Sequence, residues 1–152
     1  MPKSVFLSRR NILIGVGIVA AGGAGGTALF ARRDRFAGGE MTPEEVLAAV
    51  KANEVHLIDI RRPDEWAATG VPAGGHPIDM RRPDFLTALQ EVTHGRVDVP
   101  IALICARGVR SDRLSARLTD AGFTQIVDVP EGMLGSAAGP GWLGRGLPTR
   151  DL

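Results

Sequence analysis

The stretch that decides the fold is "LICARGVRSDRL", Leu103 to Leu114. Its first residues end an apolar run, Val99 to Cys105, that is bounded by turn residues and predicts a strand buried on both faces. Gly108 and two arginines follow, and Ser111 then opens a helical pattern as its expected N-cap. A strand, a tight loop and a helix in this order are typical of an α/β chain.

The segments on both sides of this stretch continue the alternation of strands and helices. Apolar residues at helical spacing predict inward faces made by Phe85, Leu86, Leu89 and Val92 in one helix and by Leu114, Leu118 and Ala121 in another. Helices are expected over 42–53, 63–70, 82–92 and 111–122, the last with Gly122 as its C-cap, and strands over 55–60, 76–80, 99–105 and 124–129. Strands that alternate with helices imply a parallel sheet with helices on both faces.

Charge and cysteine content exclude several classes of protein. Residues 1–37 hold six of the 18 basic residues and one of the 17 acidic ones, so the remainder carries 12 basic against 16 acidic side chains. A mildly acidic body argues against a nucleic-acid surface. The single Cys forbids a disulfide within the chain, and His56, His76 and His94 fall in no metal-ligand spacing, so no metal site is expected.

The N-terminal segment has the layout of a targeting signal. Arg9 and Arg10 precede an uncharged run from Asn11 to Ala31, an order that resembles the bacterial twin-arginine signal. The run is long enough to span a bilayer but is diluted by six glycines, so cleavage and retention as a membrane tether through residues 11–31 both stay open. We expect an export signal or membrane anchor over 1–31, a linker over 32–41 and one domain over 42–150. The protein is expected in the periplasm, or tethered to the outer face of the cytoplasmic membrane.

Cys105 is the candidate nucleophile. It lies where the strand meets a loop that opens a helix, so unpaired backbone N–H groups and the positive end of the helix dipole are expected to stabilise its thiolate. Arg107 and Arg110 add positive charge within "CARGVR", and Gly108 can adopt the positive φ that a cradle of inward-pointing amides often requires. An inert buried cysteine is the alternative, but the two arginines would then serve no packing purpose. The pattern favours chemistry on sulfur or on an oxyanion.

Three ordered motifs resemble the rhodanese (sulfurtransferase) domain, over about residues 42 to 149. The family's active loop, Cys-x-x-Gly-x-Arg, is matched by Cys105, Gly108 and Arg110. Its early motif is matched by "LIDIRRPDEW" at 57–66, and its closing motif by "EGMLGSAAGPGWLGRGLP" at 131–148. Where many members have Gly-His-Ile-Pro this chain has "TGVP", which leaves the active loop unchanged. The resemblance implies a rhodanese-like parallel sheet flanked by helices on both faces.

The resemblance also implies a persulfide mechanism. Cys105 would attack the outer sulfur of thiosulfate or a similar donor, and a thiophilic acceptor, cyanide or a thiol, would then remove that sulfur. The loop would hold the persulfide anion, and its arginines would attract the anionic donor. The expected substrate-binding residues are Ala106, Arg107, Gly108, Val109 and Arg110, with Asp59 and Ser111 as structural support and Trp66 and Trp142 in the core. No metal or organic cofactor is implied.

Two other functions stay open on the same fold. The loop counts six residues from Cys105 to Arg110, which suits sulfur, whereas the related dual-specificity phosphatases carry one more to fit phosphate. A phosphatase or arsenate reductase is therefore less favoured, and a non-catalytic binding module is the remaining hypothesis. Because the chain has one Cys, the sulfur acceptor must be external, whether a small molecule or a partner protein.

Overall fold

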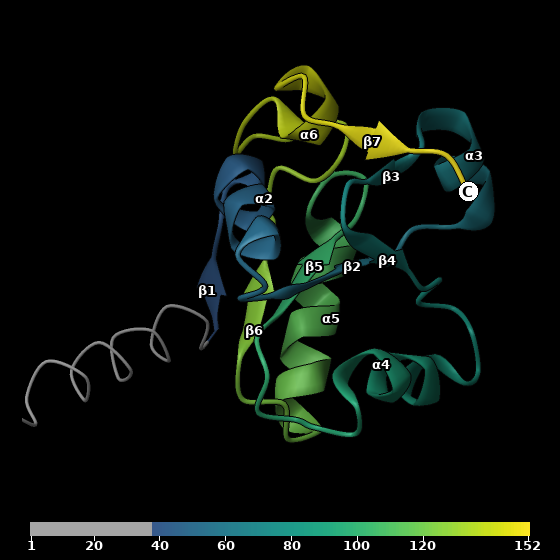
Figure 1. The fold of residues 1–152 in the computed structure, drawn as a ribbon, viewed down its shortest axis with the longest axis vertical. Coiled ribbons are helices and arrows are strands. Elements are labelled where there is room, and N and C mark those ends of the chain that lie inside the picture. The colour runs from purple at the N-terminus through teal and green to yellow at the C-terminus, as the bar shows by residue number, and fades with distance from the viewer. Residues whose placement is uncertain (1–37) are drawn as a thin grey trace, which may run out of the picture.

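A computed structural model of the chain describes residues 38–152, so the predicted export signal and most of the predicted linker lie outside the described residues. Five strands form a sheet in the order β1-β6-β5-β2-β4, and every neighbouring pair in it is parallel. Strands β3 and β7 form a separate antiparallel pair beside α3 (Figure 1). The expected α/β fold with a parallel sheet is confirmed.

The described part contains the predicted alternation of helices and strands, together with four short elements that the sequence pattern did not predict, β1, β3, α6 and β7. The strands are β1 (Gly39–Glu40), β2 (His56–Asp59), β3 (Val71–Pro72), β4 (Gly75–Pro77), β5 (Ile101–Ile104), β6 (Ile126–Asp128) and β7 (Thr149–Arg150). The helices are α2 (Pro43–Lys51), α3 (Pro63–Thr69), α4 (Phe85–Thr93), α5 (Val109–Asp120) and α6 (Gly141–Gly144). Among these helices, none is long and apolar enough to cross a bilayer.

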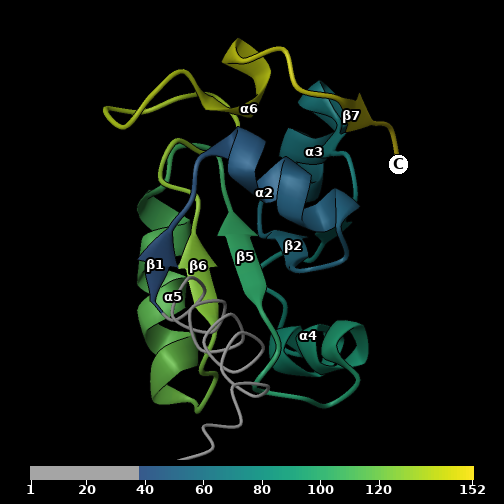
Figure 2. The same ribbon diagram turned by 60° about the vertical axis from the view of Figure 1, so that its left-hand side comes forward.

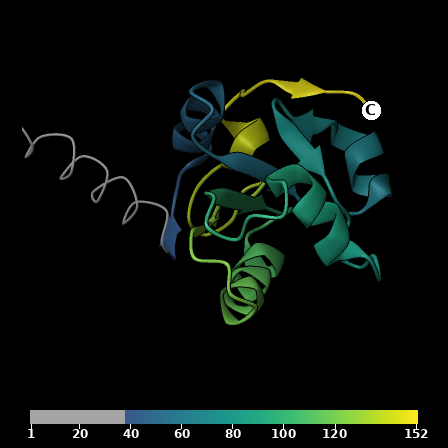
Figure 3. The ribbon, with the colours of Figure 1, turned by 60° about the horizontal axis from the view of Figure 1, so that its bottom comes forward.

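Helices cover both faces of the sheet, which explains the unbroken apolar run of β5. Ala102 and Ile104 pack into a cluster with residues of α2 and α6, whereas Ile101 and Leu103 pack into a second cluster with residues of α4 and α5. Figures 2 and 3 show α2 and α5 on opposite sides of the sheet. Successive side chains of a strand point to opposite faces, so a strand between two helical layers is apolar at every position.

Helix boundaries agree with the capping signals in one case and differ in another. Thr42 caps α2 as expected, with its hydroxyl accepting from the Glu45 N–H in a capping box. The predicted Ser111 cap of α5 is wrong, because the helix begins at Val109 with Gly108 as its N-cap. Ser111 instead lies inside the first turn and donates to the Gly108 carbonyl at 2.9 Å.

The buried face of α4 and the C-terminal end of α5 also differ from the prediction. Leu86 is exposed rather than inward, because α4 turns Phe85, Ala88 and Leu89 toward the sheet. Ala121 is exposed, and it rather than Gly122 forms the C-cap of α5.

The sheet begins earlier than the sequence pattern suggests. Residues 39–40, which the sequence assigns to the linker, pair with β6, and Met41 is buried against α2. The apolar stretch expected over 76–80 forms a strand only over 75–77. Two-residue and three-residue strands carry too few side chains for a periodic signal.

The two tryptophans differ in their burial. Trp142 is fully buried as expected, and its indole N–H donates to the Pro148 carbonyl at 2.9 Å. Trp66 is only half-buried, so its assignment to the core is not supported.

A buried ion pair joins the end of β2 to α3. The Arg61 guanidinium donates to Asp59 at 2.7 to 3.1 Å, and it also donates to the Thr69 hydroxyl at 2.8 Å and the Gly70 carbonyl at 2.7 Å. Both members of the pair are at most 1% exposed. Asp59 therefore accepts hydrogen bonds from Arg61 in the interior, and Arg61 connects the end of β2 to the C-terminal end of α3. The role of Asp59 in support of the site stays a prediction.

The same local pattern occurs a second time with a different environment. The chain reads "IDIRRPD" at 58–64 and "IDMRRPD" at 78–84. Arg81 binds Asp79 with nearly the same geometry, at 2.6 to 3.2 Å, but its side chain is 61% exposed. The chain thus contains a natural control for the effect of burial on this ion pair.

We expect Arg61→Ala to lower the free energy of unfolding by about 3 to 5 kcal/mol, because it leaves the Asp59 carboxylate buried without its partner. Arg81→Ala removes the exposed copy and should lower the free energy of unfolding far less, because solvent screens the exposed pair. Urea denaturation of the two variants measures the difference. Equal losses would show that burial does not set the strength of this interaction.

Candidate active site

The carboxyl ends of neighbouring parallel strands bring the candidate residues together. Asp59 ends β2, Cys105 directly follows β5, and Asp128 ends β6. Since β2, β5 and β6 are adjacent and parallel, all three residues lie at the same edge of the sheet. Ligands of open α/β sheets bind at this edge.

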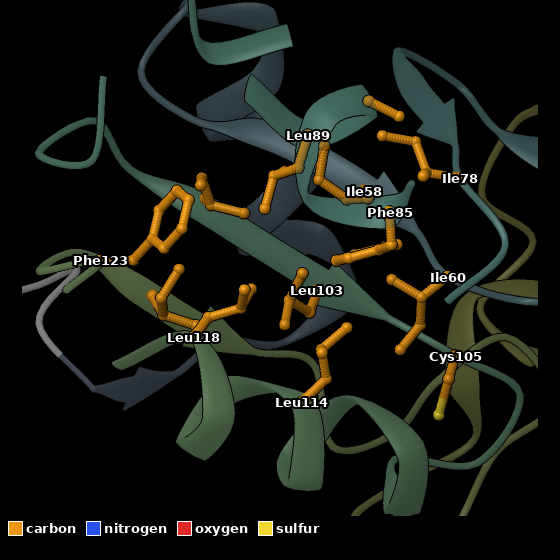
Figure 4. Close-up of a cluster of buried hydrophobic side chains, with 13 residues drawn as sticks. Ile58, Ile60, Ile78, Phe85, Leu89, Leu103, Cys105, Leu114, Leu118 and Phe123 are labelled. Carbon is orange, nitrogen blue, oxygen red and sulfur yellow. The ribbon is translucent and has the colours of Figure 1, made fainter. Parts of the chain in front are cut away.

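Cys105 lies at the end of the cluster between the sheet and α4 and α5. Figure 4 shows it beside Ile60, with the sulfur directed out of the row of apolar side chains. Its Sγ accepts from the Gly108 N–H at 3.1 Å and lies 3.6 Å from the Ser111 Oγ. The residue is 1% exposed. The Gly108 N–H is thus the hydrogen-bond donor to the sulfur, and the Ser111 hydroxyl, which donates to the Gly108 carbonyl, lies beside it.

Gly108 shapes the loop between β5 and α5. Its φ is +83°, a conformation that side chains other than Gly rarely adopt. A Cβ at this position would lie 2.3 Å from the Pro130 carbonyl oxygen. Both constraints require Gly here, and they direct the Gly108 N–H toward the sulfur.

A second loop fixes the first residues of the Cys105 loop from outside. The Met133 N–H donates to the Cys105 carbonyl at 2.9 Å, and the Leu134 N–H donates to the Ala106 carbonyl at the same distance. These bonds satisfy the backbone carbonyls of the first two residues of the Cys105 loop. The closing motif after β6 therefore supports the loop directly, although it lies far from Cys105 in sequence.

Arg110 forms a bidentate ion pair with Glu65 of α3. The two Nη atoms donate to the carboxylate at 2.8 and 2.6 Å, and both side chains are partly buried. Hydrogen bonding to Glu65 raises the pKa of Arg110, and hydrogen bonding to Arg110 lowers the pKa of Glu65. Glu65 therefore offsets much of the positive charge that the sequence assigns to the loop, and it was not among the expected site residues.

The other predicted binding residues lie around the loop with different exposures. Arg107 is exposed, and its guanidinium donates to the Gly135 carbonyl at 3.1 Å. This hydrogen bond joins the Cys105 loop to the loop that follows β6. Val109 is 58% exposed, and Ala106 is half-buried. Their roles in substrate binding stay predictions, because the structure holds no substrate.

Asp128 is a second residue that sequence reasoning missed. It is the last residue of β6, is 8% exposed, and lies at the same edge of the sheet as Cys105. Burial raises its pKa to about 6. The available signal was the alternation in "IVDV", which puts an acid on a buried face of β6.

The histidines lie away from this edge. All three line a cavity of about 690 Å³ at the amino ends of β2 and β5. Over residues 38–152, no group of three or more His, Cys, Asp or Glu side chains is placed to hold a metal ion.

Comparison with known proteins identifies the family of this arrangement. The model of the family described as "Rhodanese-like domain" matches residues 42–137. The thiosulfate sulfurtransferase GlpE of Pseudomonas entomophila (strain L48) is 26% identical over 92 residues, which cover 60% of this chain and 78% of that protein.

Solved structures with the same fold include two from other bacteria. The polysulfide-sulfur transferase homodimer of Wolinella succinogenes superposes with a TM-score of 0.58 at 24% identity, covering 85% of this chain and 89% of that one. A rhodanese-like domain from Anabaena gives a TM-score of 0.58 at 14% identity, covering 74% of this chain and 79% of that one. These structures support the fold.

We expect Gly108→Ala to lower the free energy of unfolding by about 3 kcal/mol or more, because the methyl group meets both an unfavourable φ and the Pro130 carbonyl. Gly95→Ala is the matched control, since Gly95 has a φ of +74° with nothing within 4 Å of the added Cβ. That variant should lose only about 1 kcal/mol. Chemical denaturation compares the two, and similar losses would contradict a role for the Pro130 contact.

Proposed function

The chain belongs to the family of proteins with a rhodanese-like domain, and on that basis we propose that it is a sulfurtransferase that carries a sulfane sulfur as a persulfide on Cys105. The observation that carries the proposal is the Cys105 sulfur, which accepts from the Gly108 N–H at 3.1 Å in a six-residue loop at the carboxyl end of β5. A thiolate or persulfide needs such donors because its negative charge is otherwise buried. The names of the sulfurtransferases reported above support the same chemistry.

The first half of the reaction transfers sulfur to the protein. The Cys105 thiolate attacks the outer sulfur of thiosulfate or a similar donor, a new S–S bond forms, and the S–S bond of thiosulfate breaks. Sulfite leaves with the electron pair. The product is a Cys105 persulfide anion, and the Gly108 N–H, which lies 3.1 Å from the Cys105 Sγ, is the donor placed to stabilise it.

The second half returns the cysteine to its thiolate form. A nucleophile such as cyanide or a thiolate attacks the outer sulfur of the persulfide, and the S–S bond breaks with its electron pair left on Cys105. Because Cys105 is the one cysteine of the chain, no second thiol within it can accept the sulfur. The acceptor is a small molecule or a thiol on a partner protein.

The arginines of the loop contribute unequally to attraction of an anionic donor. Arg110 is paired with Glu65, so its net effect on an approaching anion is reduced. Arg107 is exposed and donates to a backbone carbonyl, which leaves its charge uncompensated by that contact. Arg107 is therefore proposed as the stronger attractor of the donor, and Arg110 as the residue that connects the loop to α3.

Incubation with thiosulfate should increase the mass of the protein by one sulfur atom. The single cysteine makes the assignment unambiguous, so Cys105→Ser should show no increase and no cyanide-dependent formation of thiocyanate. Intact-protein mass spectrometry and a thiocyanate assay measure both. If no sulfane donor in a panel modifies the wild-type protein, the proposed sulfurtransferase activity is contradicted and the non-catalytic binding module is favoured. Hydrolysis of an aryl phosphate that depends on Cys105 would instead favour a phosphatase.

The proposal extends to the location of the protein through its N-terminal segment. The paired Arg9 and Arg10 before an uncharged run support export by the twin-arginine route, followed by release into the periplasm or retention on the membrane. Replacing both arginines by lysine should leave the protein in the cytoplasm. Cell fractionation with immunodetection measures this, and undiminished export of the Arg9→Lys, Arg10→Lys variant would contradict the route.

A further inference from the structure

Carboxylates from three elements meet at the β1 edge of the sheet, on the face that α5 covers. Glu40 of β1 is the Cα partner of Asp128 of β6, so both side chains lie on the same face. Ile126 shares this face with Asp128 and packs into the cluster beneath α4 and α5, and Asp112 comes from the first turn of α5. Figure 2 shows α5 against this end of the sheet. Neighbouring like charges repel each other, so this arrangement needs an explanation.

The three carboxylates line one surface cavity of about 230 Å³. The residues that complete the lining are Gly38, Gly39, Ser115, Ala116, Thr119 and Ile126, and no Lys, Arg or His of residues 38–152 is among them. The Ser115 and Thr119 hydroxyls donate to backbone carbonyls of their own helix at 2.9 and 3.0 Å, so their oxygens can still accept. The polar side chains of the lining thus offer acceptors and no positive charge.

Asp128 is the buried member of this group. It is 8% exposed, and its Oδ1 has no hydrogen-bond partner among the described residues. Burial is the largest cause that raises its pKa to about 6, with smaller contributions from Asp112 and Glu40. A buried carboxylate is costly unless a cation or hydrogen-bond donors compensate its charge. The cavity between β6 and α5 therefore contains an acceptor that lacks a donor.

The arrangement fits a guanidinium group better than a metal ion. Within residues 38–152, no group of three or more His, Cys, Asp or Glu side chains is placed to hold a metal ion. A guanidinium is planar, has five N–H donors in a fixed fork, and can bind several acceptors at once. It is also more weakly hydrated than an ammonium group, which favours it in a partly buried site.

We propose that this cavity is a binding site for a guanidinium group, which donates to Asp128 and is attracted by Glu40 and Asp112. None of the lining residues belongs to the loop 105–110. The inference goes beyond the proposed function, because it involves neither Cys105 nor sulfur transfer.

A guanidinium group can come from two sources. The first is this chain, because Arg32, Arg33 and Arg35 shortly precede Gly38, which lines the cavity. An extended chain spans at most about 3.6 Å per residue, so the Cα atoms of Arg35 and Gly38 are at most about 11 Å apart. The second source is a free alkylguanidine. Binding of a linker arginine would attach the segment before β1 to α5.

Trypsin cleavage of the purified full chain tests the first source. Trypsin must bind the arginine side chain, so a guanidinium held in the cavity is protected. Asp128→Asn removes the charge that binds it and should speed cleavage after the linker arginines by about threefold or more. Asp120→Asn is the matched control, since Asp120 is an exposed acid of α5 outside the cavity lining, and it should change the rate by less than about 1.5-fold. Mass spectrometry of the released fragments measures the rates.

The second arm uses the full chain with Arg32, Arg33 and Arg35 replaced by Gln, which removes the linker as a source. Agmatine, an alkylguanidine, should bind this variant, and Asp128→Asn on the same background should weaken binding by about fivefold or more. Putrescine carries the same charge without a guanidinium and should bind about fivefold or more weakly than agmatine. Isothermal titration calorimetry measures all three affinities.

The two arms separate the sources. Faster cleavage of Asp128→Asn supports the linker as the source, and agmatine binding without protection of the linker supports a free ligand. Cleavage that does not respond to Asp128→Asn, together with no agmatine binding that depends on Asp128, would overturn the proposal, as would equal binding of putrescine. If Asp128→Asn does not fold, Asp112→Asn replaces it in both arms. Neither readout depends on sulfur transfer, so failure of the proposed function would leave this test valid.

Discussion

The left-handed turn at Gly108 is the constraint on which the site depends. It directs one backbone N–H to the Cys105 sulfur at 3.1 Å and lets α5 begin at the next residue. The turn is held from the other side by Pro130, whose carbonyl leaves no room for a side chain. The relative positions of the Cys105 loop, the start of α5 and the segment after β6 therefore depend on this one backbone conformation.

Two arginines at this end of the sheet are paired with carboxylates, whereas Arg107 binds only a backbone carbonyl. Arg61 is bound to Asp59 in the interior and Arg110 to Glu65 in a partly buried pair, so the charges of these two arginines are largely neutralised. The backbone donor and the helix N-terminus are left as the main stabilisation of negative charge on the sulfur. Such stabilisation is directional, and it favours an anion that sits at the position of Sγ over anions elsewhere on the surface.

A sulfurtransferase benefits from this arrangement because its sulfur is anionic both before and after loading. A fixed backbone donor serves the thiolate and the persulfide alike. Under the proposed function the acceptor is external, since Cys105 is the one cysteine of the chain.

The sequence by itself indicated the alternation of the longer helices and strands, the buried central strand and the candidate nucleophile. An apolar run that ends in Cys and is followed by Gly and a helical pattern can be recognised locally, because strand burial and helix periodicity leave signals within a few residues. The capping box at Thr42 is equally local, and it appears as predicted. The very short strands β1 and β3 left no such signal.

Only the tertiary structure decided which residues meet. Glu65 lies 45 positions before Arg110, and the loop around Leu134 lies far beyond Cys105 in the chain, so their contacts depend on how α3 and the segment after β6 fold over the sheet edge. The two copies of the Asp-x-Arg pattern have the same local geometry, yet one is buried and the other exposed. Local pattern sets hydrogen bonds between near neighbours, whereas burial and long-range pairing are properties of the packed chain, and at this site they set the charge around the sulfur.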